Sequence, residues 1–288
     1  MQLIRFNELV RKVQNYTNVN LSGYLENNIL PDVTQTIYSQ AMLTCISNYV
    51  VYDECIKNAV YPDCLMGYSL GLTNALYCSG SITLRDLSDL TYSVARCIGN
   101  SVKECAFFDM GTIIGLDMED VKKLITENNC SQYVFIASEN SEYFIVISGL
   151  REYVEIILDK AISAGALKAK ALKTNFAFHT HMIDKYIDDF YCTVENVNYS
   201  DTRVPIMSIY TQKLICKADE LREELRKNIV SCMKWRKTVE CIENTSTAEF
   251  WDMSPDCSNK KSTVLKSNSV FNTLKSLENY KTDMEEII

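Results

Sequence analysis

The sequence predicts an α/β fold in two parts: a large α/β domain, residues 1–110 and 177–288, and an inserted small ferredoxin-like domain, residues 111–176. Two observations carry this prediction. In residues 63–78, a short apolar run breaks into a glycine-flanked serine and then into a helical pattern. Residues 111–176 alternate strand-like runs with helical patterns in the order β-α-β-β-α-β.

Composition sets broad limits. The chain has 288 residues, which suits one large domain or two smaller ones, and it is 47% hydrophobic and 23% charged, as is typical of a soluble globular protein. The first residues lack the uninterrupted apolar core of a signal peptide, and no run reaches the roughly 20 apolar residues that span a bilayer. We therefore expect a cytoplasmic protein with no membrane partner.

Cysteine usage and charge exclude further classes. The 12 cysteines are scattered and form no C-x-x-C pair, so we expect reduced thiols and no zinc. We expect no metal and no cofactor. The net charge of −8 argues against a nucleic acid partner.

Hydrophobic periodicity places the elements. It predicts helices over residues 7–27, 32–56, 84–106, 118–128 and 150–164. Runs rich in β-branched and aromatic residues predict strands over residues 111–116, 132–138, 143–148 and 171–176. A brief strand is expected over residues 63–66, and the polar tail from 258 to 288 is expected to be a closing helix or partly disordered.

The most informative motif is a G-x-S-x-G turn, Gly67-Tyr68-Ser69-Leu70-Gly71. Such a strand-to-helix bend forces the serine outward, and its glycines remove side chains that would clash or shield the hydroxyl. The N–H groups of the following helix would face a negative charge beside Ser69, so the backbone N–H of Leu70 is the expected oxyanion donor. Ser69 is the candidate nucleophile. The alternative is a turn that serves packing only.

Only two histidines exist, His179 and His181, both in the segment 176–182. A serine of ordinary pKa needs a neighbouring base, most often histidine, so this segment must supply one. The alternatives are a hydrogen-bonded core histidine and a His-x-His metal site. The metal interpretation is weak because there is no third histidine and the carboxylates that follow lie on a helical pattern.

Several motifs in the same order together resemble the malonyl-CoA:acyl carrier protein transacylases and the stand-alone acyltransferases of polyketide assembly. The serine turn resembles their G-H-S-L-G, and Ala177-Phe178-His179-Thr180 resembles their A-F-H-S. The remaining similar blocks are residues 137–141, 145–149, 225–228 and 233–235. The resemblance covers roughly residues 30–255 and implies an α/β-hydrolase-like large domain.

The resemblance also implies roles for single residues. Ser69 would take the acyl group from coenzyme A and pass it to the phosphopantetheine thiol of an acyl carrier protein, with His179 as base and then acid. The backbone carbonyl of Asn228 would orient His179. The substrate site would be lined by Gln40, Asn140 and Phe178.

An arginine of the family pairs with the free carboxylate of malonyl, since a guanidinium fits a carboxylate fork. Arg96 is the candidate here, about one residue off the family's spacing, and the alternative is a solvated charge on a helix surface. The chain also departs from the family pattern: it lacks the opening F-P-G-Q-G-S-Q turn, Tyr68 and Leu72 replace a histidine and a glutamate, and Asn228 replaces a glutamine. We therefore expect an oxyanion hole that is built differently, or reduced activity.

Carrier proteins are usually acidic, so docking on this acidic chain would need a local basic surface. The candidates are Lys168, Lys170 and Lys173, and the later run of Arg222, Arg226, Lys227, Lys234, Arg236 and Lys237. Either group would otherwise be a solvated face. Two other functions stay open: an acyl-carrier-protein hydrolase of the same fold, and a catalytically impaired homologue that only binds carrier protein.

Overall fold

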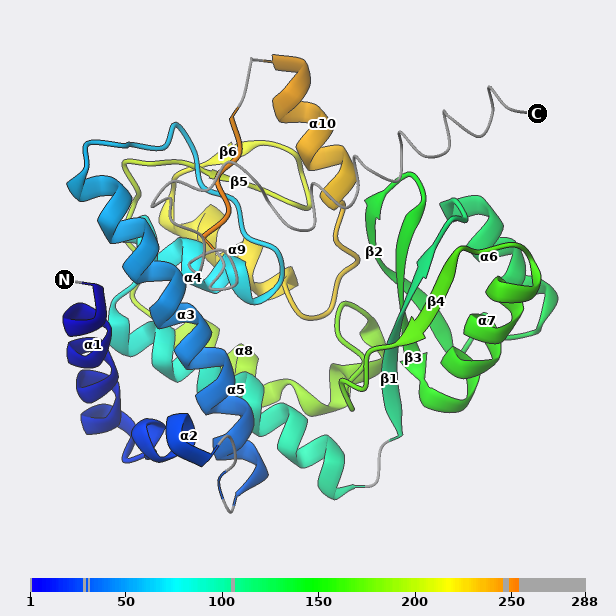
Figure 1. The fold of residues 1–288 in the computed structure, drawn as a ribbon, viewed down its shortest axis with the longest axis horizontal. Helices are drawn as coiled ribbons and strands as arrows, with labels where there is room; N and C mark the ends of the chain where they lie inside the picture. The colour runs from blue at the N-terminus through cyan, green and yellow to red at the C-terminus, as the bar shows by residue number, and fades with distance from the viewer. Residues whose placement is uncertain (1, 28–29, 31, 105–106, 246–248, 254–288) are drawn as a thin grey trace. The chain divides into compact units, whose positions relative to one another are not determined.

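The computed structural model describes residues 2–27, 30, 32–104, 107–245 and 249–253, and they form two compact units (Figure 1). The first unit comprises Met1–Asn100 and Tyr186–Arg226, with residues 251–253. The second comprises Ser101–Lys185 and Lys227–Phe250. The expected tail element over residues 258–288 lies outside the described residues. In the described ranges, no helix combines the length and the apolar character needed to cross a membrane.

Most of the first unit is helical. Its helices are α1 (Gln2–Thr17), α2 (Leu21–Asn27), α3 (Val33–Lys57), α4 (Leu70–Cys78), α5 (Leu84–Lys103), α8 (Asp188–Asn196) and α9 (Ala218–Lys227). The single helix expected over residues 7–27 is two helices, because Asn18 takes a left-handed φ of 57° and ends α1. Asp32 begins α3, since its carboxylate accepts the Gln35 N–H at 2.9 Å.

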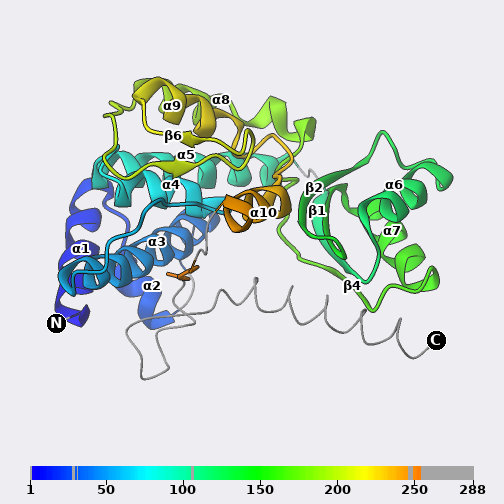
Figure 2. The same ribbon diagram turned by 90° about the horizontal axis from the view of Figure 1, so that it is seen from above.

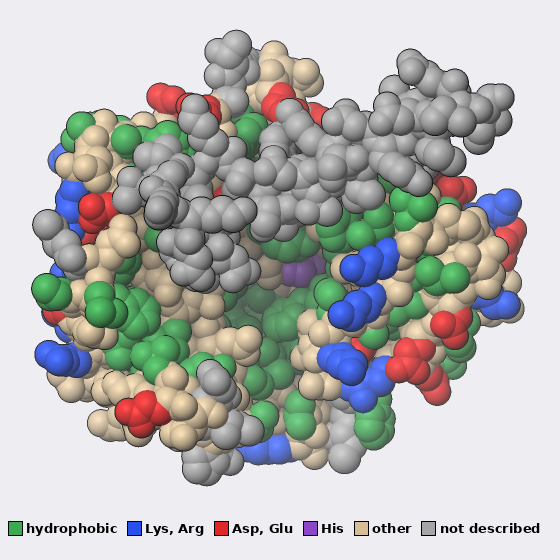
Figure 3. All heavy atoms as spheres, viewed as in Figure 1, with side chains coloured by type: hydrophobic (Ala, Val, Ile, Leu, Met, Phe, Trp, Pro, Cys, Tyr) green, Lys and Arg blue, Asp and Glu red, His purple; other side chains and the backbone are tan. Residues whose placement is uncertain are grey.

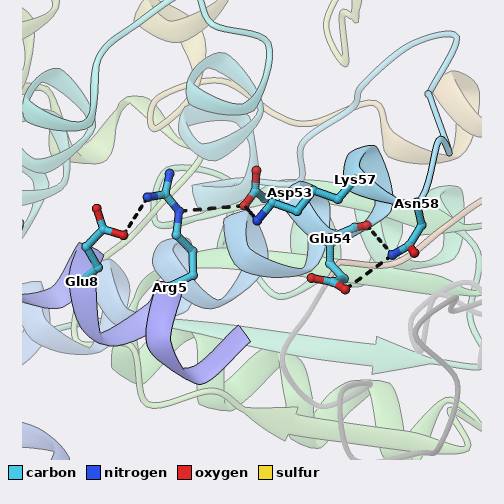
Figure 4. Close-up of polar contacts among 6 residues, drawn as sticks. All are labelled: Arg5, Glu8, Asp53, Glu54, Lys57 and Asn58. Carbon is cyan, nitrogen blue, oxygen red and sulfur yellow. Dashed lines mark hydrogen bonds and ion pairs between the residues drawn. The ribbon is translucent and has the colours of Figure 1, made fainter. Parts of the chain in front are cut away.

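Charged side chains link α1 to α3 (Figure 4). Arg5 donates to Glu8 at 3.0 Å, and its Nε lies 3.8 Å from the Asp53 carboxylate, which also pairs with Lys57 at 2.6 Å. Partly exposed ion pairs of this kind contribute about 0–1 kcal/mol each. Apolar burial therefore supplies most of the attachment, through Leu9, Val10 and Val13.

Extended structure in the first unit is short. Leu65 pairs in parallel with Ile206 as an isolated bridge, in which the Leu65 N–H donates to Pro205 O at 2.9 Å and the Met207 N–H donates to Leu65 O at 2.8 Å. The strand expected over residues 63–66 is reduced to this bridge, because its neighbour β5 (Ile206–Met207) is only two residues long. A two-residue strand β6 (Leu214–Ile215) pairs with β5 in antiparallel fashion.

The small ferredoxin-like domain is confirmed in the second unit. Its elements follow the order β1 (Phe108–Ile114), α6 (Met118–Glu127), β2 (Val134–Ser141), β3 (Phe144–Leu150), α7 (Arg151–Ser163) and β4 (Lys168–Ala171). The strands form one antiparallel sheet in the order β2-β3-β1-β4. Figure 2 shows α6 and α7 on one face of this sheet. A 3₁₀ helix, η1 (His181–Tyr186), and α10 (Trp235–Thr245) complete the described elements of the unit.

The core of the second unit lies between the sheet and its two helices. The buried side chains on β1, β3 and α7 include Ile113, Ile145, Ile147, Val154 and Ile157. Gly111 permits the close approach of α7, since a Cβ there would lie 2.8 Å from a methyl group of Leu158. This packing holds β1 against α7.

The prediction of a strand over residues 171–176 is wrong. The strand is β4 (Lys168–Ala171), and the residues after it are irregular. Lys173 and Asn175 take left-handed φ values of 58° and 55°, a conformation that cannot continue a β ladder. The remaining strands and helices predicted for the small domain overlap those of the structure.

Candidate active site

Ser69 lies in a strained turn at the start of α4. Its backbone has φ 54° and ψ −115°, a region that costs a non-glycine residue roughly 1–3 kcal/mol and is often found at functional sites. Two hydrogen bonds close the turn: Gly71 N–H to Tyr68 O at 2.9 Å, and Leu72 N–H to Ser69 O at 3.0 Å. The serine is partly exposed, at the geometry expected of an outward-facing nucleophile.

The two glycines of the turn differ in their surroundings. A Cβ on Gly67 would lie 2.2 Å from the Leu72 nitrogen and 2.3 Å from the Gly71 carbonyl carbon, so only glycine fits at this position. A Cβ on Gly71 would have no atom within 4 Å. A Cβ would therefore clash at Gly67 and would not clash at Gly71, where the expected benefit of glycine, an unshielded hydroxyl, stays a prediction.

Behind Ser69, α4 is buried almost from its start. Five consecutive residues are buried, Leu72, Thr73, Asn74, Ala75 and Leu76. A helix buried on all sides is held firmly, so its N-terminus is a rigid platform for the serine. Leu70 is its first residue, and N–H groups of a first turn have no partner within the helix. The role of Leu70 as an oxyanion donor stays a prediction.

His179 lies in the second unit, between β4 and η1. Its side chain and backbone are 3% exposed, and its φ is 63°, another left-handed conformation. Its N–H donates to Ile229 O at 2.7 Å, and the hydroxyl of the next residue, Thr180, donates to Ala177 O at 2.9 Å. These bonds fix the backbone on both sides of the imidazole.

Burial lowers the pKa of His179 from its ordinary 6.5 to about 4. Backbone hydrogen bonds with Asn228 and Ser231 act in the opposite direction and raise the pKa. An accepting carbonyl has this effect, because it favours the protonated ring. The imidazole is therefore neutral at physiological pH, which is the form that can accept a proton.

The chain after α9 joins His179 to the sheet. Asn228 is 3% exposed, and Met233 forms a parallel bridge with Ser138 of β2, with its N–H donating to Ala137 O at 2.9 Å. On the same strand, Asn140 is 5% exposed and its Oδ1 accepts the Ser138 hydroxyl at 2.6 Å. Three of the predicted site residues, His179, Asn228 and Asn140, thus belong to one compact unit.

The two aromatic neighbours of His179 differ in burial. Phe178 is partly buried and packs edge-on against Phe176, with ring centroids 4.9 Å apart, and against the cluster of Met110, Ala137 and Val146. His181 is exposed, with its ring edge-on to Phe135 and the ring centroids 4.5 Å apart.

Across the part of the chain that the structure describes, no three His, Cys, Asp or Glu side chains gather as a metal site.

The other predicted site residues belong to the first unit. Gln40 is on α3 and exposed. Arg96 is exposed on α5, where its Nε lies 3.5 Å from the Asp189 carboxylate and its guanidinium lies 5.8 Å from the centre of the Tyr92 ring. Binding of a substrate carboxylate by Arg96 would have to compete with Asp189.

Sequence reasoning missed Asp109, a carboxylate on β1 that is 3% exposed. It bonds to the segment that carries His179. The available signal was an acidic residue inside a strand-like apolar run, where a charge needs a partner.

Curated relatives of similar sequence carry one description. The chain is 24% identical over 284 residues to the malonyl CoA-acyl carrier protein transacylase of Buchnera aphidicola subsp. Schizaphis graminum. The aligned region covers 93% of this chain and 88% of that protein. The transacylase of Synechocystis is 25% identical over 194 residues, 67% of this chain. The chain spans 63% of the length of that relative. No model of a known protein family matches.

Solved structures show the same fold. A malonyl-transacylase in complex with a type II polyketide synthase acyl-carrier protein superposes with a TM-score of 0.81 at 20% identity, over 95% of this chain and 85% of that one. The malonyl CoA-acyl carrier protein transacylase of Coxiella burnetii gives a TM-score of 0.79 at 20% identity, over 95% and 83%.

The serine turn on α4 and the ferredoxin-like second unit are the parts of a two-domain α/β fold shared with solved acyltransferases. By sequence, the chain is similar to curated malonyl-CoA:acyl carrier protein transacylases, at 24% and 26% identity.

Proposed function

We propose that this protein moves a malonyl or related acyl group from coenzyme A to the phosphopantetheine thiol of an acyl carrier protein through an acyl-Ser69 intermediate. The observation that carries the proposal is the backbone of Ser69, a left-handed serine at the N-terminus of a buried helix. A turn that serves packing only would explain Gly67, where no Cβ fits, but it leaves the strained, partly exposed Ser69 without a purpose, and a nucleophile supplies one.

The chemistry has two steps. The Ser69 hydroxyl adds to the thioester carbonyl while His179 accepts its proton, and the carbon–sulfur bond then breaks as the coenzyme A thiol takes that proton. In the second step the carrier thiol gives its proton to His179 and attacks the serine ester, and Ser69 regains its proton. The N–H of Leu70 would stabilise the oxyanion in both steps. Asn228 would orient His179 through its backbone.

We assign substrate contacts to Gln40, Arg96, Asn140 and Phe178 on the family resemblance. Asn140 has a supporting feature, because its side chain is already held by Ser138 and is therefore preorganised. The partner is an acyl carrier protein, and no cofactor takes part in these steps. We place the reaction in the cytoplasm, which agrees with the ten free thiols among the described residues.

The acidic carrier protein needs a basic surface. In Figure 3, Lys and Arg side chains gather over β4, the edge strand of the small sheet. Lys168 and Lys170 on β4, and Lys173 two residues after its end, are exposed. We therefore propose that these three lysines contribute to carrier docking, by favouring encounter with a negative partner.

The test is intact-protein mass measurement after incubation with malonyl-CoA or acetyl-CoA, followed by addition of holo-carrier protein. We expect a malonyl adduct on the native protein, none on Ser69→Ala, and its transfer to the carrier thiol. Acyl-carrier turnover that releases free acid without a stable adduct would indicate the hydrolase. Carrier binding without any adduct, unchanged in Ser69→Ala, would indicate a binding protein.

A further inference from the structure

The chain from β4 to His179 is held in an unfavourable conformation. Three non-glycine residues within seven positions take left-handed φ values: Lys173 at 58°, Asn175 at 55° and His179 at 63°. Each such residue costs of the order of 1 kcal/mol or more and persists only where its surroundings fix it. The contacts that fix this segment therefore also fix the place of the imidazole.

The main contact is Asp109, on the neighbouring strand β1. Its Oδ1 accepts the N–H of Thr174 at 2.9 Å and the N–H of Met110 at 2.8 Å. Thr174 is the residue between the two left-handed positions 173 and 175. The Thr174 hydroxyl donates to Phe176 O at 2.9 Å, so the Asp109 carboxylate and this local bond together hold the bend.

Arg151, the first residue of α7, completes this arrangement. Its Nη2 donates to Asn175 Oδ1 at 2.6 Å and to Phe108 O at 3.4 Å, and its Nε lies 4.0 Å from Asp109 Oδ2. A buried carboxylate is costly unless donors and a cation compensate it. Here the donors are the N–H groups of Thr174 and Met110, and the cation is Arg151, which also donates to Asn175.

We infer that Asp109, supported by Arg151, is a positioning residue for His179: it fixes the bend at residues 173–175 and thereby holds the imidazole in the place where it accepts the proton. The inference rests on the proposed function. Asp109 acts through the backbone, so it is not a catalytic residue.

The variants are Asp109→Ala, which removes the acceptor, and Asp109→Asn, which keeps one acceptor oxygen and weakens the pairing with Arg151. The matched control is Glu224→Gln in the first unit. Glu224 is also 3% exposed and also fixes a turn, accepting Ser208 Oγ at 2.6 Å and Ile209 N–H at 2.9 Å.

For Asp109→Ala we expect kcat for malonyl transfer to fall roughly 10- to 100-fold, as for a misplaced catalytic group, with KM for malonyl-CoA nearly unchanged. Asp109→Asn should recover much of the loss. Glu224→Gln should leave kcat close to native. An unchanged kcat in Asp109→Ala, or an equal fall in Glu224→Gln, would overturn the inference.

A second measurement does not depend on activity. With only two histidines in the chain, NMR resolves both imidazoles, and exposed His181 serves as the internal reference. In Asp109→Asn, and in Asp109→Ala if it folds, the His179 ring signals should shift and those of His181 should not. If the native protein transfers no acyl group, the proposed function fails while this measurement still tests the positioning. Unshifted His179 signals in both variants would refute the positioning itself.

Discussion

Arg96 and Asp189 form an ion pair across two helices of the first unit, α5 and α8, with Arg96 Nε 3.5 Å from Asp189 Oδ2. Both side chains are nearly half exposed, so the pair contributes little to stability, about 0–1 kcal/mol. Its interest lies in function, because Asp189 presents to Arg96 the same chemical group as the free carboxylate of malonyl.

Substitution of this pair tests whether Arg96 selects the acyl group. We expect Arg96→Ala to lower kcat/KM for malonyl-CoA about 10-fold or more and to leave acetyl-CoA nearly unchanged, because only malonyl offers a carboxylate. Asp189→Asn should lower KM for malonyl-CoA by removing the competing carboxylate. Equal effects on both thioesters would make Arg96 a surface charge and no more.

The two histidines should differ sharply. We expect His179→Ala to reduce transfer about 10²- to 10⁴-fold, the usual contribution of a general base, and His181→Ala to retain most activity, since its ring is exposed against Phe135. Steady-state rates with both thioesters measure this. The reverse result would show that the base is misassigned.

The pH dependence follows from the pKa of His179, which burial lowers to about 4. The base stays neutral until the pH falls well below 6.5, so the acid limb of kcat/KM should lie near pH 4–5 rather than near pH 6.5. The unfolded chain binds this proton more readily than the folded one, so stability is lost as pH falls from about 6.5 to about 4, by roughly 3 kcal/mol.

Carboxylates titrate in the same range, and the histidine part is therefore the difference between native protein and His179→Ala. Urea unfolding at several pH values measures it. We expect the native free energy of unfolding to fall more steeply than that of the variant between pH 6.5 and 4. Parallel curves would contradict a buried neutral imidazole.

Alanine substitutions at Gly67 and Gly71 test whether the serine turn needs glycine at each of its two glycine positions. Gly67→Ala should destabilise the protein by more than about 2 kcal/mol and abolish acylation, because its Cβ would overlap backbone atoms of Gly71 and Leu72. Gly71→Ala should be tolerated and even stabilising by up to about 1 kcal/mol, since the site is open and helical. Thermal unfolding and intact mass report both effects.

Strain at Ser69 has a separate test. Ser69→Gly and Ser69→Ala both remove the hydroxyl and should both abolish the adduct, but only glycine adopts φ 54° without cost. We expect Ser69→Gly to be about 1–2 kcal/mol more stable than Ser69→Ala, as measured by denaturant unfolding. Equal stabilities would mean that the turn is not strained.

Local patterns predicted much of the fold. The β-α-β-β-α-β order of the small domain is readable because each element buries one face with its own period, and helix α6 lies within the residues expected for it. The strand expected over 171–176 failed, because the two left-handed residues there depend on contacts with Asp109 and Arg151. Those contacts join residues far apart in sequence, which periodicity does not report.

By itself, the sequence determined which residues are candidates for the chemistry: a G-x-S-x-G serine, one of only two histidines, and motifs in the order of one family. These signals are local, because turn geometry and nucleophilic chemistry both demand particular residue types at fixed spacing. The tertiary structure alone decided the state of those residues. Burial keeps the His179 imidazole neutral, Asp189 pairs with Arg96, and a carboxylate on β1 bonds to the bend before the imidazole. Solvent exclusion and long-range pairing arise only once the chain is packed.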